Sequence, residues 1–260
     1  MAPPSTVSTP PRAPVDHARF YTDAYSLADA GDAERYGRWR LLSAGTKADH
    51  VVELCRRVDL SPDTIVEIGC GQGALLAQLA ARRLAPRLDG FDLSPPAVEI
   101  ARSHGIPGVT VEAFDGAHLP AGDRAYDLAV ISHVLEHVPD PPALLAEGAR
   151  VATWVLVEVP LEANRSAARP AKRAQAAGIG HIQCFDRPAV RALCHGAGLD
   201  VRAELADPLS YAHHGFTATD TRAKLRAGVK AGVRRAAWTA APGAAERWFT
   251  VHFACLARAA

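Results

Sequence analysis

The 260-residue sequence lacks an excess of either charge, because 29 Lys and Arg residues face 28 Asp and Glu residues, for a formal net charge of +1. Proteins whose main partner is nucleic acid use a concentrated surplus of Lys and Arg to neutralise phosphates. The charge balance therefore gives no reason to expect nucleic acid as a partner.

Long apolar runs are also missing, since none approaches the roughly 20 residues that a membrane span needs. The N-terminus does not show the basic segment followed by an apolar one that is typical of a signal peptide. We expect no membrane partner and a cytoplasmic location.

Cysteine is scarce and scattered. The five cysteines are an odd number, and no two of them form a C-x-x-C motif. This pattern excludes a disulfide framework and a thiolate zinc site as sequence-level expectations. We expect small, buried cysteine side chains.

The chain divides into three parts. Residues 1–15 are rich in Pro, Ser and Thr and predict a disordered tail. Residues 16–58 carry a helical apolar period, as in KADHVVELCRRV, and predict an N-terminal helical lid segment. From residue 59 to residue 260, apolar runs alternate with helix-length segments. This alternation predicts the α/β class: a Rossmann-like, doubly wound, mostly parallel seven-stranded sheet with helices on both faces.

Two stretches, 161–186 and 207–247, do not fit the alternation. Ligands of such sheets bind outside the carboxyl ends of the strands. We therefore expect both stretches to be insertions that cap this edge of the sheet.

The sequence VEIGCGQG places Gly69, Gly71 and Gly73 between a predicted strand and a predicted helix. Glycines at such a turn let the backbone approach a nucleotide-type ligand closely. The motif alone leaves open a dinucleotide, through the G-x-G-x-x-A spacing to Ala74, and a purely structural turn.

Three acids narrow the choice of ligand. Asp92 ends the next predicted strand, where a carboxylate can accept both ribose hydroxyls, and Asp115 follows the third, near where an adenine amino group would lie. Glu67 precedes the glycines, where a buried acid suits a cationic ligand better than a pyrophosphate. The cofactor predicted from this charge argument is S-adenosylmethionine, with S-adenosylhomocysteine as product.

The segments VEIGCGQG, FDLS, FDGAHLP and YDLAVISHVLEHVPDP, in this order, resemble the motifs of class I S-adenosylmethionine-dependent methyltransferases. LEHVPDP is similar to small-molecule enzymes of the ubiquinone-biosynthesis O-methyltransferase type. The resemblance implies that Glu67, Gly69 and Gly71 border the methionine part, while Asp92 binds ribose and Asp115 binds adenine. The full set of expected cofactor residues is Glu67, Gly69, Gly71, Gly73, Asp92, Leu93, Asp115, Gly116, Ser132 and His133. An N-P-P-Y motif is absent after the fourth strand, which disfavours nucleobase and protein-glutamine acceptors.

Histidines are the candidates for acceptor chemistry, because an imidazole with a pKa near neutrality suits a general base. His133 ends the fourth predicted strand, and His181 lies in the first insertion. We expect one of them to be the catalytic base and favour His181. We read Glu136 and His137 as structural or cofactor-proximal. The residues expected to contact the acceptor are Tyr21, Tyr25, His181, His213 and His214, although a solvated turn stays open for the last two. No compact carboxylate cluster suggests magnesium, so we expect no metal.

The predicted function is methyl transfer by in-line displacement to a small molecule, most simply a hydroxyl of a specialised metabolite. N- or C-methylation, a catalytically silent binder and, more distantly, an NAD-dependent oxidoreductase stay open. A homodimer and an acidic carrier protein also stay open as partners. The basic run from residue 222 to residue 235 is read as a solvated helix face, with docking of an anionic acceptor as the alternative.

Overall fold

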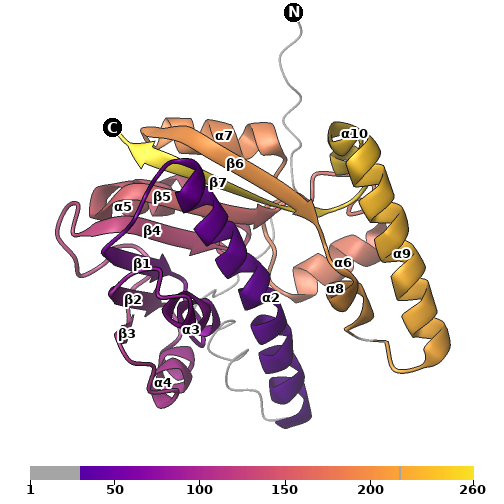
Figure 1. Ribbon diagram of the computed structural model, residues 1–260, viewed down its shortest axis with the longest axis horizontal. Helices are drawn as coiled ribbons and strands as arrows, with labels where there is room; N and C mark the ends of the chain where they lie inside the picture. Colours follow the sequence, from indigo (N-terminus) through magenta and orange to yellow (C-terminus); the bar gives the residue numbers. More distant parts are fainter. Residues whose placement is uncertain (1–29, 217) are drawn as a thin grey trace, which may run out of the picture.

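The computed structural model describes residues 30–216 and 218–260, with side chains from residue 37 onward. Its frame is a seven-stranded sheet in the order β3-β2-β1-β4-β5-β7-β6 (Figure 1). The strands are β1 (Thr64–Ile68), β2 (Arg87–Asp92), β3 (Val109–Ala113), β4 (Tyr126–Ser132), β5 (Ala152–Pro160), β6 (Leu199–Pro208) and β7 (Val251–Ala259). β1 to β5 pair in parallel, and β7 runs antiparallel to both of its neighbours. The predicted fold class is confirmed.

Helices cover both faces of the sheet (Figure 1). The helices on the faces are α2 (Ala30–Arg57), α3 (Ala74–Ala81), α4 (Pro95–Ser103), α5 (Pro141–Val151) and α7 (Arg187–Gly196). Four further helices are α6 (Pro170–Gly178), α8 (Tyr211–Gly215), α9 (Thr221–Ala240) and α10 (Pro242–Trp248). Apolar residues of α2, α3 and α4 form one core cluster with the sheet, and those of α5 and α7 form the other. Because the central strands are covered on both faces, β4 is buried along nearly its whole length.

Local sequence signals set several helix starts. Asp140, Asp186 and Asp220 each accept a hydrogen bond from the backbone N–H three residues later. Such N-caps satisfy donors that the first turn of a helix leaves unpaired. A proline in the first turn follows two of these caps, in α5 and α7, where its missing N–H costs nothing.

The register of β6 and β7 explains why the second insertion stays at the carboxyl edge. Pro208 at the end of β6 lies opposite Val251 at the start of β7. The chain thus leaves and re-enters the sheet at one edge, and α8, α9 and α10 gather there beside α6 (Figure 1). Both predicted insertions, 161–186 and 207–247, therefore contribute helices at the edge where ligands bind in this kind of sheet.

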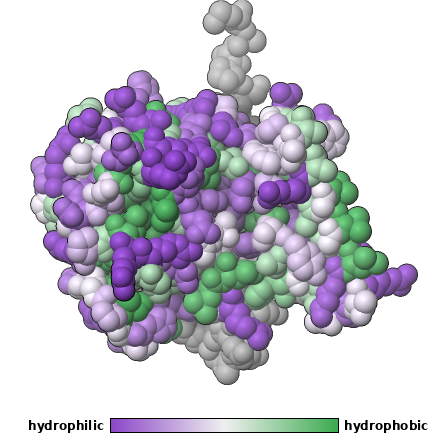
Figure 2. Space-filling model, viewed as in Figure 1, coloured by the Kyte–Doolittle hydropathy of each residue, from purple (hydrophilic) through white to green (hydrophobic). Residues whose placement is uncertain are grey.

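The outer face of α9 carries apolar side chains as well as cations. Leu225, Val229 and Val233 follow each other at intervals of four residues and are 68%, 60% and 64% exposed. Figure 2 shows green residues along the right-hand edge of the molecule, where α9 lies in Figure 1. This face is exposed and carries apolar side chains in addition to the cations of the basic run.

Several expectations fall outside the described residues, namely the tail 1–15, the first part of the segment 16–58, and Tyr21 and Tyr25. The cysteine expectation was wrong at one position, because Cys184 is exposed whereas the other four are buried. Within the described part of the chain, no helix is both long and apolar enough to cross a membrane.

Candidate functional site

A cavity of about 3010 Å³ opens at the carboxyl ends of the central strands. The loops after β1, β2, β3 and β4 form one side of it, while α2 and the two insertions form the other. One continuous space therefore reaches from the predicted cofactor residues to the predicted acceptor residues.

The glycine loop after β1 has the left-handed backbone that its sequence suggests, with φ of 80° at Gly69, 54° at Gly71 and 74° at Gly73. A Cβ atom on Gly69 would lie 2.5 Å from Cγ2 of Val134, so only glycine fits there. Gly69 and Gly71 line the cavity, whereas Gly73 does not appear in its wall. A Cβ atom on Gly73 would instead meet Ala101 of α4 at 3.3 Å, which gives this glycine a role in the turn and in helix packing.

Asp92 fastens the glycine loop to the end of β2. Its two carboxylate oxygens accept hydrogen bonds from Gly71 N at 2.7 Å and from Ser94 N at 2.9 Å. Burial raises the pKa of Asp92, while these two N–H groups and the charge of Arg40 act against that rise. Each carboxylate oxygen can accept a further bond, so Asp92 is placed to receive ribose hydroxyls from the cavity.

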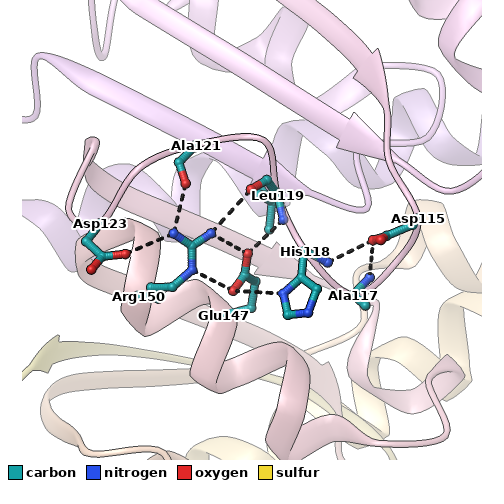
Figure 3. Close-up of polar contacts among 8 residues, drawn as sticks. All are labelled: Asp115, Ala117, His118, Leu119, Ala121, Asp123, Glu147 and Arg150. Atoms are coloured by element: carbon teal, nitrogen blue, oxygen red, sulfur yellow. Dashed lines mark hydrogen bonds and ion pairs between the residues drawn. The ribbon is translucent and has the colours of Figure 1, made fainter.

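The loop after β3 holds Asp115 at the cavity wall by a network of hydrogen bonds and ion pairs (Figure 3). Asp115 Oδ1 accepts from Ala117 N and His118 N, both at 2.8 Å. Further along the loop, Glu147 of α5 accepts from Leu119 N at 2.7 Å and pairs with Arg150. The two N–H groups lower the pKa of Asp115, which keeps an acceptor in place for an amino group. Leu93 and Gly116 line the same part of the cavity.

Glu67 is the buried acid that the charge argument singled out. It is 4% exposed, and its Oε2 atom has no hydrogen-bond partner in the described part of the chain. Burial raises the pKa of Glu67, and the charge of Lys47 on α2 partly offsets the effect. A buried carboxyl oxygen without a partner is costly, and a ligand that brings positive charge and N–H donors would remove the cost. The acids at the ends of β1, β2 and β3 thus suit S-adenosylmethionine, which carries an ammonium and a sulfonium group but no phosphate.

The end of β4 begins the acceptor side of the cavity. His133 adopts a left-handed backbone with φ of 57°, which turns the chain sharply after Ser132. Its Nδ1 atom lies 3.2 Å from Oε1 of Glu136, and its Nε2 atom is buried without a hydrogen-bond partner. Burial lowers the pKa of His133 to about 3, aided by the charge of Lys47. A neutral imidazole with a pKa this low is a weak base, so these contacts do not favour His133 as the group that takes a proton.

His181 has different surroundings. Backbone bonds from Ile182 N and Gln183 N to Glu136 O, at 2.8 and 3.1 Å, tie its loop to the turn after β4. Its Nδ1 atom lies 2.7 Å from Oε2 of Glu162. Burial alone would lower the pKa of His181, but the hydrogen bond and charge of Glu162 outweigh it and raise the pKa. A carboxylate on Nδ1 orients the ring and leaves Nε2 to accept a proton.

Glu136 and His137 lie between these two histidines. Glu136 is 1% exposed, and apart from the 3.2 Å ion-pair contact of Oε1 with His133, neither carboxylate oxygen makes a hydrogen bond with the described residues. Burial raises the pKa of Glu136 and lowers the pKa of His137 to about 4. The His137 ring stands edge-on to that of His181, with the centroids 4.8 Å apart.

His213 and His214 belong to α8 and line the cavity. His213 is buried, with Nδ1 2.8 Å from Ser210 Oγ and its ring edge-on to Trp39 of α2. Burial lowers the pKa of both imidazoles, to about 4 for His214. The structure thus places them in a cavity wall, which disfavours the solvated turn left open above.

Sequence reasoning missed a buried network behind the acceptor side. Glu158 near the end of β5 is fully buried, and its oxygens lie 2.7 Å from His50 Nδ1 and 2.6 Å from Ser132 Oγ. His50 also lies 3.4 Å from Asp207 through Nε2, while His252 at the start of β7 packs edge-on to His133. The acid in the otherwise apolar strand VLVEVP was the available signal. His50 therefore belongs to this network.

Among residues 30–216 and 218–260, two groups of three side chains have ligand atoms within 4.8 Å of one another and could hold a metal ion. One is Glu136, His137 and His181, and the other is His133, Glu158 and His252. Imidazole with carboxylate suits zinc, manganese or iron better than magnesium. The expectation of no metal was based on the lack of carboxylates close together in the sequence. The fold instead assembles these two groups from residues that are far apart in the sequence.

Comparison with known proteins gives the family. The model of a family described as a methyltransferase domain matches residues 34–204. The ubiquinone biosynthesis O-methyltransferase of Nitrosomonas europaea is 35% identical over 100 residues, which cover 35% of this chain and 40% of that protein. The matched segment is therefore less than half of that curated relative.

Solved structures resemble this one over most of its length at low identity. A putative methyltransferase in complex with the Haloferax volcanii Trm112 activator gives a TM-score of 0.59 at 16% identity, covering 95% of this chain and 99% of that one. A geranyl diphosphate C-methyltransferase from Streptomyces coelicolor A3(2), with S-adenosyl-L-homocysteine bound, gives 0.55 at 14% identity, covering 77% of this chain and 73% of that one. At identities of 16% and 14%, the likeness shows a shared fold and nothing further.

Proposed function

The chain belongs to the methyltransferase domain family, whose cofactor is S-adenosylmethionine, and on that premise we propose that it methylates a hydroxyl group of a small specialised metabolite. The observation that supports a hydroxyl acceptor is the His181–Glu162 pair on the acceptor side of the cavity. Nδ1 of His181 lies 2.7 Å from Oε2 of Glu162. A hydroxyl must lose its proton to become a good nucleophile, whereas an amine attacks through its free lone pair and can release a proton to water afterwards.

In this proposal the two halves of the cavity divide the work. Bound S-adenosylmethionine supplies an electrophilic methyl group on a positively charged sulfur. Asp92 and Asp115 hold its ribose and adenine, and Glu67 stabilises its positive charge. These contacts fix the distance between methyl group and acceptor, which is the main contribution of a protein to such a displacement.

His181 removes the proton from the acceptor. Its Nε2 atom takes the hydroxyl proton, and Glu162 on Nδ1 stabilises the imidazolium that results. The raised pKa of His181 makes it a better proton acceptor than His133, whose pKa is lowered to about 3. His213 and His214 shape the wall that contacts the acceptor.

N- or C-methylation is the alternative acceptor chemistry. Named relatives of this chain include an O-methyltransferase and a C-methyltransferase, so the fold accommodates more than one acceptor atom. A cytoplasmic location, a homodimer and a small molecule as the partner remain part of the proposal.

The direct test incubates the protein with S-adenosylmethionine and fractionated metabolite extracts. We expect formation of S-adenosylhomocysteine together with a product heavier than its acceptor by one methylene group. Nuclear magnetic resonance of the product then assigns the methyl group to oxygen, nitrogen or carbon. S-adenosylmethionine binding without any product from any fraction would favour the silent binder.

A further inference from the structure

Charge is separated along the wall of the cavity. Every acidic residue in the described part of the wall lies at or before Glu162 in the sequence, among the cofactor loops and the histidine cluster. After residue 162 the described wall contains no acid. It contains six cationic side chains, which are Arg165, Lys172, Arg173, Lys230, Arg234 and Arg247.

These cations come from separate elements and line the same cavity, and Lys172, Lys230 and Arg234 lie close enough to act on one another. Lys172 lies on α6, Lys230 and Arg234 lie on α9, and Arg247 lies on α10. No carboxylate among the described residues pairs with any of the six. The guanidinium groups of Arg165 and Arg234 stack over the rings of Trp248 and Phe249, at 4.6 and 5.0 Å from the centroids. Stacking holds an arginine in place while leaving its N–H groups available.

The cations also act on one another and on a nearby imidazole. Burial lowers the pKa of Lys230, and the charges of Arg234 and Lys172 lower it further. Nε2 of His214 is buried without a hydrogen-bond partner, and Lys230, Arg234 and Lys172 all lie close enough to lower the pKa of that ring. Lys172 and Lys230 are exposed and Arg234 is half-buried, so these three cations lie at the mouth of the cavity around a buried nitrogen without a partner, where a bound anion would offset their repulsion.

We propose that the wall formed by α6, α8 and α9 binds a phosphate or diphosphate group carried by the methyl acceptor. A multiply charged anion matches several converging cations better than a single carboxylate does, and planar guanidinium groups bind phosphate oxygens in pairs. This inference rests on the proposed methyl transfer, because it names the class of acceptor that the same cavity takes.

The first test measures binding of inorganic pyrophosphate to the full-length protein loaded with S-adenosylhomocysteine, by titration calorimetry at low salt. We expect Lys172→Met, Lys230→Met and Arg234→Met each to weaken binding by about tenfold or more, as for loss of a charge-assisted contact. Arg222→Met and Arg226→Met are matched controls on α9, because both residues are exposed and neither lines the cavity. They should leave binding unchanged.

The affinity for S-adenosylhomocysteine, measured on every variant, reports whether the fold and the cofactor half are intact. Pyrophosphate that does not bind, or that loses as much affinity in the two controls as in the cavity variants, overturns the anion site. Protein that binds pyrophosphate but not S-adenosylhomocysteine keeps the anion site and rejects the proposed function instead.

A second test treats an acceptor-containing extract with phosphatase before the methylation assay. We expect the treated extract to lose its acceptor, while addition of S-adenosylmethionine to an untreated extract still gives product. Equal methylation of treated and untreated extracts would contradict a phosphorylated acceptor and leave methyl transfer itself intact.

Discussion

Single residues at the strand ends carry much of the chemistry proposed here. Asp92 links two roles in this proposal, because the carboxylate that orders the glycine loop through Gly71 N also lines the cavity where we place the ribose. Asp115 likewise accepts a hydrogen bond from Ala117 N within its own loop and also lines the cavity. Residues with both a structural and a binding contact need variants that separate the two.

Asp92→Ala should weaken S-adenosylmethionine binding at least about tenfold, because each lost charge-assisted bond is worth about 1.5–3 kcal/mol. Asp92→Asn keeps one acceptor oxygen, so its affinity for S-adenosylmethionine should lie between those of the wild type and Asp92→Ala. Calorimetry measures the affinity, and circular dichroism checks the fold. Wild-type affinity in folded Asp92→Ala would show that the ribose lies elsewhere.

His181→Ala should lower kcat by about 10²–10⁴-fold and remove the ascending limb of the pH–rate profile, since the base is lost. His133→Ala, the paired variant, should change KM more than kcat, because its imidazole is a weak base in this site. Affinity for S-adenosylmethionine should stay near the wild-type value in both.

The outcomes for the two histidines separate three mechanisms. If both variants keep wild-type kcat and pH dependence, the protein acts through proximity, and a nitrogen or carbon acceptor becomes the better interpretation. If a chelator abolishes activity and zinc or manganese restores it, Glu136, His137 and His181 act as metal ligands instead of as a base with its neighbours.

Elements of the fold position these residues from a distance. The loop after β3 would be free to move if it were held only by its ends. Instead, α5 reaches across with Glu147 and Arg150, which bind Leu119 N, Leu119 O and Ala121 O (Figure 3). The sequence of α5 therefore contributes to the adenine side of the cavity.

Glu147→Ala should weaken S-adenosylhomocysteine binding, although Glu147 belongs to a helix well separated in sequence from Asp115. It removes the acceptor for a buried N–H and one partner of Arg150, with a cost of about 1–3 kcal/mol in unfolding free energy. Urea unfolding measures the stability and calorimetry the affinity. Asp123→Ala is the control, because Asp123 is exposed and pairs with Arg150 at the far end of the loop. If both variants bind the cofactor product equally well, the network does not position Asp115.

At the scale of the whole molecule, buried histidines make stability depend on pH in two opposite ways. The pKa of His252 is lowered to about 3 by burial and by the charge of His133, so the unfolded chain takes up this proton first as pH falls. The stability from keeping His252 neutral is present above about pH 6.5 and is lost as pH falls from there towards 3. The pKa of His50 is raised to about 9, because its bonds to Asp207 and Glu158 outweigh burial. Its contribution is complete below about pH 6.5 and is lost as pH rises towards 9.

We therefore expect His252→Asn to flatten the acid side of the stability profile and His50→Asn to flatten the alkaline side. The slope that each variant removes is at most about 1.4 kcal/mol per pH unit. Urea unfolding across this pH range measures both slopes. His195→Asn, at an exposed position on α7, is the control and should leave the profile unchanged. A His252 variant with the wild-type acid slope would contradict the neutral, buried imidazole.

The sequence by itself determined the sheet, the glycine loop and the acids at the strand ends. Strand and helix periods, N-caps and glycine turns depend on neighbours within a few residues, so they can be read from a short window. The carboxyl ends of parallel strands also meet at one common edge, and this predicts that Asp92 and Asp115 lie at the same edge as Gly69.

Only the tertiary structure decided which histidines meet which acids. Glu158 meets His50 across 108 residues, and His181 meets Glu162 because backbone bonds bring the first insertion back to the turn after β4. The basic run in the sequence does not tell which cations of α9 face the cavity. The fold decides that Lys230 and Arg234 line it, whereas Arg222 and Arg226 do not. The balance between burial and charge sets each pKa, and both depend on packing between distant segments. For that reason the proposed proton acceptor and the proposed anion-binding wall follow from the fold, while the cofactor follows from the sequence.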